Sequence, residues 1–189
     1  MTHGPLARIA RLLLRIAGYR VAGSLPDVRS CVLVFAPHTS NWDFLILLLA
    51  RTALARKVSY LAKDTLFRPP FGWFFRMTSG IPVDRRQHRR MVDAVAQEFI
   101  TRGDLWLAMA PEGTRARTDH WKSGFYYIAL AAKVPILLTG IDARRKEYVV
   151  GDLLWPSGDV ENDLEQIRAF YRDKSGIHPE RAGEVRFRG

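Results

Sequence analysis

Two apolar runs that end in polar, turn-forming loops constrain the fold of this chain most strongly. The runs are Cys31–Ala36 and Asp104–Ala110, and a proline follows each of them directly. A short apolar run closed by a turn signal is typical of a buried strand. In an open α/β sheet, ligands bind where the loops after such strands gather. The residues that follow Ala36 and Ala110 are therefore the first candidates for a functional site.

Stretches with helical periodicity alternate with strand-like stretches along the rest of the chain. We expect further strands at 57–62, 80–83 and 134–141, with an edge strand at 146–153, and helices at 44–50, 86–102, 123–133 and 159–174. The helix at 86–102 should turn Val95, Phe99 and Ile100 towards the core. This alternation predicts an α/β fold in which helices flank a mixed, largely parallel sheet. No Pro/Gly/Ser-rich linker or repeat divides the 189 residues, which favours a single domain.

The loop after the first apolar run contains a base and an acid, His38 and Asp43. A leucine-rich helix follows, with Ser40 or Asn41 as its expected cap. Within one continuous helix the two side chains would lie about 140° apart, because each residue turns the helix by roughly 100°. A loop at His38 removes this restriction, so the carboxylate can hold one ring nitrogen while the other accepts a proton. The alternative is a histidine with an ordinary structural partner and an aspartate that only caps the helix.

The loop after the second apolar run is Pro111-Glu112-Gly113-Thr114-Arg115. It combines turn-forming residues with an arginine that can bind an anion. Together with His38 and Asp43, this loop suggests acyl transfer to a substrate hydroxyl. The alternative is that Glu112 and Arg115 form an ion pair in a solvated turn.

Two further motifs connect these loops to a known family. Gly80-Ile81-Pro82-Val83-Asp84-Arg85 is a Gly-x-x-x-x-Arg block, and Val134-Pro135-Ile136 begins a predicted strand. With the His38-to-Asp43 and Pro111-to-Arg115 motifs, in this order, the chain resembles the glycerolipid acyltransferases of the lysophosphatidate acyltransferase type. The resemblance covers residues 31–141 and implies a fold like that of glycerol-3-phosphate acyltransferase.

The resemblance implies catalytic roles for His38 and Asp43. His38 would be the general base that removes a proton from the acceptor hydroxyl, and Asp43 would fix its tautomer and stabilise the imidazolium. The hydroxyl would attack a fatty acyl thioester carried by coenzyme A or by acyl carrier protein. No bound cofactor and no metal are implied.

The resemblance also implies a site for a phosphate group of the acceptor. Arg85 and Arg115 would bind it, because a guanidinium is a planar fork that matches phosphate oxygens. Glu112 would orient an arginine or the loop, Gly113 would allow close backbone approach, and Thr114 would supply a hydroxyl donor.

Lys122 is a secondary candidate for the same anion, because relatives often carry a lysine before a glycine near this position. An ordinary surface lysine is the alternative. The acceptor itself stays open among lysophosphatidic acid, another lysophospholipid, glycerol phosphate and a glycolipid.

Charge and the N-terminal stretch indicate a membrane contact. The chain has 29 Lys and Arg against 19 Asp and Glu, a net charge of +10 that favours an anionic partner. As a helix, residues 5–17 would present an arginine stripe beside an apolar one, which suits a membrane interface and prevents spanning. The arginines are Arg8, Arg11 and Arg15, and the apolar residues are Leu6, Ile9, Leu13 and Ile16.

We therefore expect an amphipathic interface helix within residues 1–22, followed by an acyltransferase domain at 23–189. The protein would lie on the cytoplasmic face of an anionic membrane as a peripheral protein. The single cysteine, Cys31, falls in a predicted buried strand and fits a reducing compartment. The aromatic segment 66–77 is open to three interpretations: core packing, an acyl channel, or a second membrane contact.

Other classes of function remain at this point. A nucleic-acid-binding protein could use the basic run at 85–90, but no helix-turn-helix, zinc-finger or RNA-recognition signature is present, so we expect no nucleic acid. A metal-dependent hydrolase could use His38, Asp43 and Glu112, but no His-x-x-x-His or cysteine cluster completes a site. A catalytically inactive lipid-binding relative is the third alternative.

Overall fold

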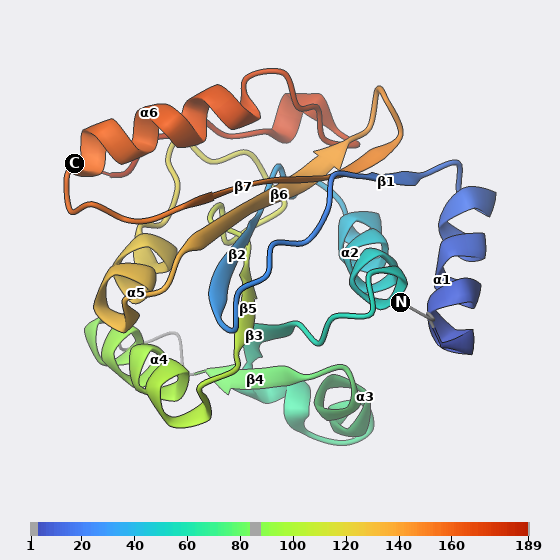
Figure 1. Cartoon of the computed structure of the whole chain (residues 1–189), viewed down its shortest axis with the longest axis horizontal. Helices are drawn as coiled ribbons and strands as arrows, with labels where there is room; N and C mark the ends of the chain where they lie inside the picture. The colour runs from blue at the N-terminus through green and yellow to red at the C-terminus, as the bar shows by residue number, and fades with distance from the viewer. Residues whose placement is uncertain (1–3, 84–87, 189) are drawn as a thin grey trace.

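The computed structural model describes residues 4–83 and 88–188, and a sheet of seven strands crosses its centre (Figure 1). Apolar side chains dominate these strands because most of the sheet is covered on both faces. The strands are β1 (Arg20–Ala22), β2 (Cys31–Phe35), β3 (Ser59–Lys63), β4 (Gly80–Val83), β5 (Trp106–Met109), β6 (Ile136–Asp142) and β7 (Glu147–Leu154).

The strand order is β1-β7-β6-β2-β5-β3-β4. From β6 to β4 all neighbours are parallel, whereas β6 and β7 form an antiparallel pair. Parallel strands end at the same edge of a sheet, so the loops after β2, β5 and β6 lie at one edge. The central position of β2 places its following loop, which begins at Pro37, between the loops of its two neighbours.

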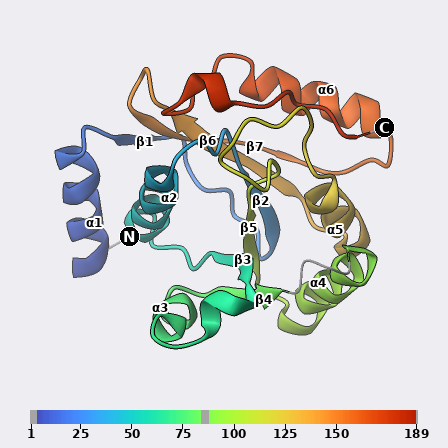
Figure 2. The ribbon, with the colours of Figure 1, turned by 180° about the vertical axis from the view of Figure 1, so that it is seen from behind.

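Helices cover the two faces of the sheet, and the predicted mixed α/β fold with a largely parallel sheet is confirmed (Figures 1 and 2). One side carries a core to which α1 and α2 contribute, and the other a core to which α4, α5 and α6 contribute. The helices are α1 (Pro5–Ile16), α2 (Asn41–Ala53), α3 (Gly72–Met77), α4 (His88–Arg102), α5 (Gly124–Ala132) and α6 (Val160–Tyr171), with 3-10 turns η1 (Asp64–Phe67) and η2 (Pro179–Arg181).

Two expectations about individual residues are wrong. The stretch 146–153 is not an edge strand, because β7 pairs with β6 on one side and with β1 on the other. β1 has only three residues, which is too short for a periodic signal. Ile100 does not face the core: Val95 and Phe99 are buried, but Ile100 is 65% exposed on the opposite side of α4. Cys31 is fully buried, as its place in an apolar run predicts.

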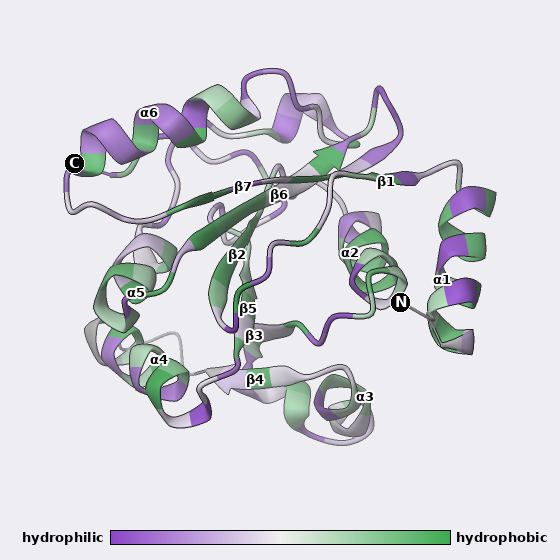
Figure 3. Cartoon of the chain, in the orientation of Figure 1, coloured by the Kyte–Doolittle hydropathy of each residue, from purple (hydrophilic) through white to green (hydrophobic). Residues whose placement is uncertain are grey.

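Hydrophilic and hydrophobic residues alternate along α1 (Figure 3). The small residues Ala7 and Ala10, together with Leu14, are buried, and α1 packs on α2. Small side chains permit this close approach. The apolar stripe predicted from the sequence points away from the core: Leu6, Ile9, Leu13 and Ile16 are all exposed.

The aromatic segment divides between the core and the surface. Phe67 is buried and its ring lies 5.9 Å from that of Phe75, whereas Phe71, Trp73 and Met77 are exposed. Core packing therefore accounts for only part of this segment. In residues 4–83 and 88–188, none of the helices combines the length and the apolar character needed to cross a bilayer.

The close approach of β6 to the end of β2 gives a stability prediction. A Cβ atom on Gly140 would lie 2.0 Å from the carbonyl oxygen of Ala36, a backbone atom that cannot rotate away. We expect Gly140→Ala to cost about 3 kcal/mol and to lower the Tm by roughly 6–12 °C. Gly124→Ala is the matched control, because the nearest atom to its Cβ would be 4.0 Å away. Calorimetry that finds equal Tm values for the two variants would contradict this packing.

Candidate active site

The His38 loop, residues 37–40, leads from the central strand β2 into α2. Ser40 caps α2 as expected: its hydroxyl accepts a hydrogen bond from the amide of Trp42, and Asp43 at the third helical position completes a capping box. The fully buried Asp43 carboxylate accepts hydrogen bonds through Oδ2 from the amides of Thr39 (2.6 Å) and Ser40 (2.7 Å). Two backbone donors thus fix the position of this carboxylate, which also satisfies otherwise free N–H groups near the start of the helix.

His38 and Asp43 are in contact. Nδ1 of His38 lies 3.4 Å from Oδ2 of Asp43, and the imidazole remains 18% exposed. In the part of the chain that the structure describes, neither Nδ1 of His38 nor Oδ1 of Asp43 has a hydrogen-bond partner. The contact is therefore loose, as catalytic pairs often are before substrate binds. Asp43 caps the helix, but capping is not its only contact, because its carboxylate also faces the imidazole.

Glu112 joins the second motif to the first. Its Oε2 accepts a hydrogen bond of 2.8 Å from the backbone amide of His38, and the residue is only 4% exposed. Burial raises the pKa of Glu112 to about 7; the His38 N–H lowers this pKa in part, and the negative charge of Asp43 raises it further. A neutral Glu112 limits the repulsion between two buried carboxyl groups that lie under the same histidine.

Arg115 of the second motif contacts the start of α2, and Lys122, seven residues further on, lies over the turn of this motif. The guanidinium of Arg115 donates a hydrogen bond to the side-chain oxygen of Asn41, two residues before Asp43. Gly113 has a φ of +65°, and a Cβ there would lie 2.6 Å from Nζ of Lys122, so the lysine lies directly over this glycine. The alternative of a solvated pair between Glu112 and Arg115 is excluded, because Glu112 is buried and accepts a hydrogen bond from the amide of His38.

One predicted site residue, Thr114, is not part of this arrangement. The hydroxyl of Thr114 accepts a hydrogen bond from Ala116 within its own exposed turn. Arg85 lies outside the described residues. The described residues contain no group of three His, Cys, Asp or Glu side chains placed to hold a metal ion.

Sequence reasoning missed Thr39 as a residue of the site. Thr39 is fully buried, and its hydroxyl accepts a hydrogen bond from the amide of His178, 139 positions later in the chain. The sequence around a loop threonine does not indicate a hydrogen bond to a residue so far along the chain. Asn41 was considered only as a cap, although its side chain contacts Arg115.

The arrangement brings together a partly exposed imidazole, a buried carboxylate beside it, and an arginine from the loop after β5 that contacts the start of α2. The Acyltransferase family model matches residues 20–141, and the chain belongs to this family. The match includes β1 to β5, most of β6, and both motif loops.

Individual relatives carry the same family name. The chain is 30% identical over 128 residues to the 1-acyl-sn-glycerol-3-phosphate acyltransferase of Streptococcus pneumoniae, covering 66% of this chain and 47% of that protein. It is 33% identical over 141 residues to the probable enzyme of this name from Mycoplasma pneumoniae, covering 69% and 52%. The chain thus spans about half the length of the curated relatives it matches.

A solved structure has the same fold. The crystal structure of the 1-acyl-sn-glycerophosphate acyltransferase PlsC from Thermotoga maritima superposes with a TM-score of 0.60 at 18% identity. The superposition covers 87% of this chain and 74% of that one. Most of the chain outside residues 20–141 therefore also belongs to this fold.

The raised pKa of Glu112 gives a pH prediction. Between its ordinary pKa of 4.5 and about 7, the folded protein keeps a proton on Glu112 that the unfolded chain releases, so this residue destabilises the fold progressively as pH rises through that window. We expect Glu112→Gln to gain up to about 3 kcal/mol of stability relative to wild type from pH 4.5 to 8, because the amide stays neutral.

The measurement is denaturant unfolding of wild type and variant across this pH range. Glu98→Gln is the matched control for loss of one carboxylate, because Glu98 is 43% exposed on α4 and its ion pair with Arg102 is a surface pair that contributes little to stability. A stability difference between wild type and Glu112→Gln of equal size at pH 5 and pH 8 would contradict the raised pKa.

Proposed function

We propose that this protein transfers a fatty acyl group from an acyl thioester to a hydroxyl of a lysophospholipid or glycerol-phosphate-type acceptor. The thioester is carried by coenzyme A or by acyl carrier protein. The observation that carries this proposal is the contact between His38 and the buried Asp43 at the carboxyl edge of the sheet. The names of the relatives support the 1-acylglycerol-3-phosphate acyltransferase type.

In the proposed reaction, His38 is the general base. Its free ring nitrogen takes the proton from the acceptor hydroxyl as the oxygen attacks the thioester carbonyl, and Asp43 stabilises the imidazolium that forms. The tetrahedral intermediate collapses by breaking the C–S bond. The thiolate leaves with the proton from His38, so the products are the ester and the free thiol, and the enzyme returns to its starting state.

Each remaining motif residue has a role in this proposal. Arg115 and Lys122 bind phosphate oxygens, together with Arg85, and Gly113 leaves room for the lysine. Glu112 is a positioning residue, because its carboxyl group holds the backbone of His38 and not the substrate. Thr114 supports its own turn.

Loss of the base or of its partner tests the chemistry. We expect His38→Ala to reduce acyl transfer by about 100-fold or more, because it removes the proton acceptor. Asp43→Asn should reduce it by a comparable factor, because it removes the charge that orients the imidazole. The assay is incubation with labelled acyl-coenzyme A and a panel of lysolipids, with products identified by mass.

Asp152→Asn is the matched control, since Asp152 is exposed on β7. Its turnover should equal that of wild type. Near-normal turnover by folded His38→Ala would contradict the mechanism, and absence of product from wild type with every acceptor would favour an inactive lipid-binding relative.

We also propose that the protein is peripheral on an anionic membrane through α1. Five apolar side chains of this helix are exposed, the four of the predicted stripe and Leu12, and Arg8 and Arg15 are exposed beside them. An exposed apolar stripe next to cations suits the boundary between acyl chains and anionic headgroups. The buried Ala7 and Ala10 hold the helix to the domain.

Substitutions confined to the exposed stripe test this contact without disturbing the packed face. We expect the combined variant Leu6→Ser, Ile9→Ser, Ile16→Ser to reduce sedimentation with anionic liposomes by about tenfold or more, because each buried apolar side chain contributes roughly 1.5–3 kcal/mol. Ile100→Ser, an exposed isoleucine on α4, is the matched control. Undiminished sedimentation of the combined variant would assign the membrane contact to another surface.

A further inference from the structure

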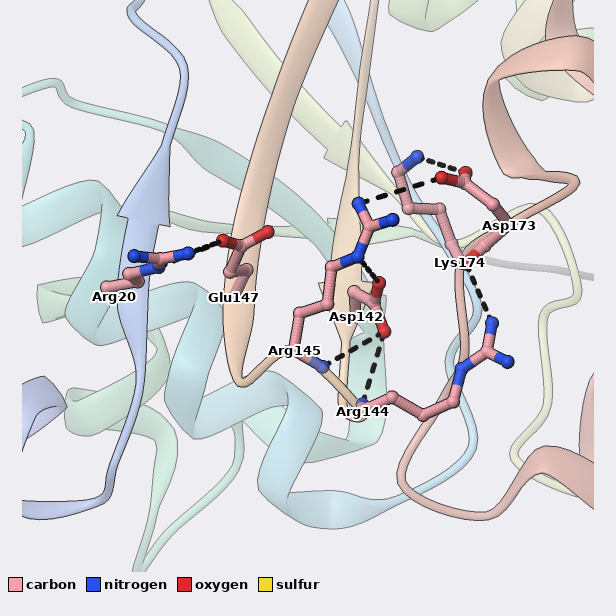
Figure 4. A network of polar contacts seen from close by, with 7 residues as sticks. All are labelled: Arg20, Asp142, Arg144, Arg145, Glu147, Asp173 and Lys174. Carbon is pink, nitrogen blue, oxygen red and sulfur yellow. Dashed lines mark hydrogen bonds and ion pairs between the residues drawn. The ribbon is translucent and has the colours of Figure 1, made fainter.

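The chain continues after α6 as a C-terminal strap, residues 175–187, that lies outside the span of the family model. The β6–β7 hairpin holds the residues directly before the strap, Asp173 and Lys174 (Figure 4). The buried Asp142 accepts hydrogen bonds from the amides of Arg144 and Arg145, and the Arg144 guanidinium donates to the carbonyl of Asp173 at 2.9 Å. The amide of Ala143 then donates to the carbonyl of Ser175 at 2.7 Å.

The end of the strap is fixed on the other side of the site. The amide of Trp121 donates to the carbonyl of Arg186 at 2.7 Å, and the ring of Phe187 lies 5.8 Å from that of Phe125. The guanidinium of Arg168 donates to the carbonyl of Val185 at 2.9 Å. The strap therefore runs from the loop after β6 to the segment that follows the second motif.

Between these two anchors the strap rests on the His38 loop. A Cβ on Gly176 would lie 2.7 Å from the hydroxyl of Thr39 and 3.2 Å from the ring of Pro37. The amide of His178 donates to that hydroxyl at 3.1 Å, and Nη1 of Arg181 lies 3.5 Å from the carbonyl oxygen of Thr39. Arg181 thus reaches the residue directly after His38.

From this placement we infer that Arg181 is a binding residue for a phosphate group of the substrate. Its side chain is 47% exposed, so donors remain for a ligand, and its acidic neighbour Glu180 is an exposed carboxylate 3.7 Å away that is easily displaced. Arg115 contacts Asn41, the first residue of α2, directly after this loop. Two guanidinium groups from separate parts of the chain therefore lie beside the loop that carries the proposed base.

This inference rests on the proposed function, which makes the ligand a phosphate-bearing substrate of acyl transfer. Arg181 recognises the phosphate group of that substrate. That phosphate belongs either to the acyl acceptor or to coenzyme A. Direct binding distinguishes these sources, using lysophosphatidate against monoacylglycerol for the acceptor and coenzyme A against pantetheine for the donor. In each pair the second compound lacks phosphate.

Binding of these four compounds is measured with wild type, Arg181→Gln and Arg181→Lys, the lipids being kept below their critical micelle concentrations. We expect Arg181→Gln to weaken binding of lysophosphatidate or of coenzyme A by about tenfold, because a charged hydrogen bond is lost. Arg181→Lys should recover part of the loss, and the phosphate-free partner should bind unchanged. Arg186→Gln, a change of one charge on the same strap, is the matched control and should bind all four compounds as wild type does.

An equal loss for phosphate-bearing and phosphate-free compounds, or no loss for either phosphate compound, would overturn the inference. A loss of equal size in Arg186→Gln would also overturn it, because net charge would then be the cause. In turnover, Arg181→Gln should raise KM for the phosphate-bearing substrate with kcat within about twofold; a fall in kcat at unchanged KM would assign Arg181 a merely structural role. Because binding needs no turnover, a protein that binds phosphate through Arg181 and forms no ester contradicts the proposed function alone.

Discussion

The site depends on how the Asp43 carboxylate is held at the start of α2. One oxygen, Oδ2, accepts the amides of Thr39 and Ser40, and the same oxygen faces Nδ1 of His38. The Asp43 carboxylate therefore has two roles: it caps α2, and it places a negative charge beside the imidazole. Because Asp43 has no exposed surface, this charge is not screened by solvent as a surface carboxylate would be.

The strand order of the sheet brings other parts of the chain to this local motif. β2 lies between β5 and β6, so Glu112 from the loop after β5 can hold the amide of His38. The strap approaches from the side of β6 and holds Thr39. The His38 loop is thus fixed at consecutive residues by a helix cap, a neighbouring loop and a distant segment, which leaves the imidazole ring as its partly exposed group.

Sequence reasoning succeeded where the signal is local. The apolar run at 31–36 predicted β2, and the polar residues before the leucine-rich stretch predicted a cap at Ser40 or Asn41, which the structure places at Ser40. It failed where pairing decides the outcome: β1 is three residues long and is defined by its register with β7, and Ile100 is exposed because its neighbour Phe99 occupies the core side of α4. The strap has no helical or strand periodicity, so only the folded chain reveals its contact with Thr39.

The hydrogen bond between Glu112 and the amide of His38 joins residues 74 positions apart, and the one between His178 and Thr39 joins residues 139 positions apart. Contacts of such long range close large chain loops, so their entropic cost must be met by many other contacts across the domain. The geometry of the His38 loop is therefore not determined by residues 37–43 alone, although these residues contain the cap of α2. It belongs to the whole folded domain and is lost when the domain unfolds.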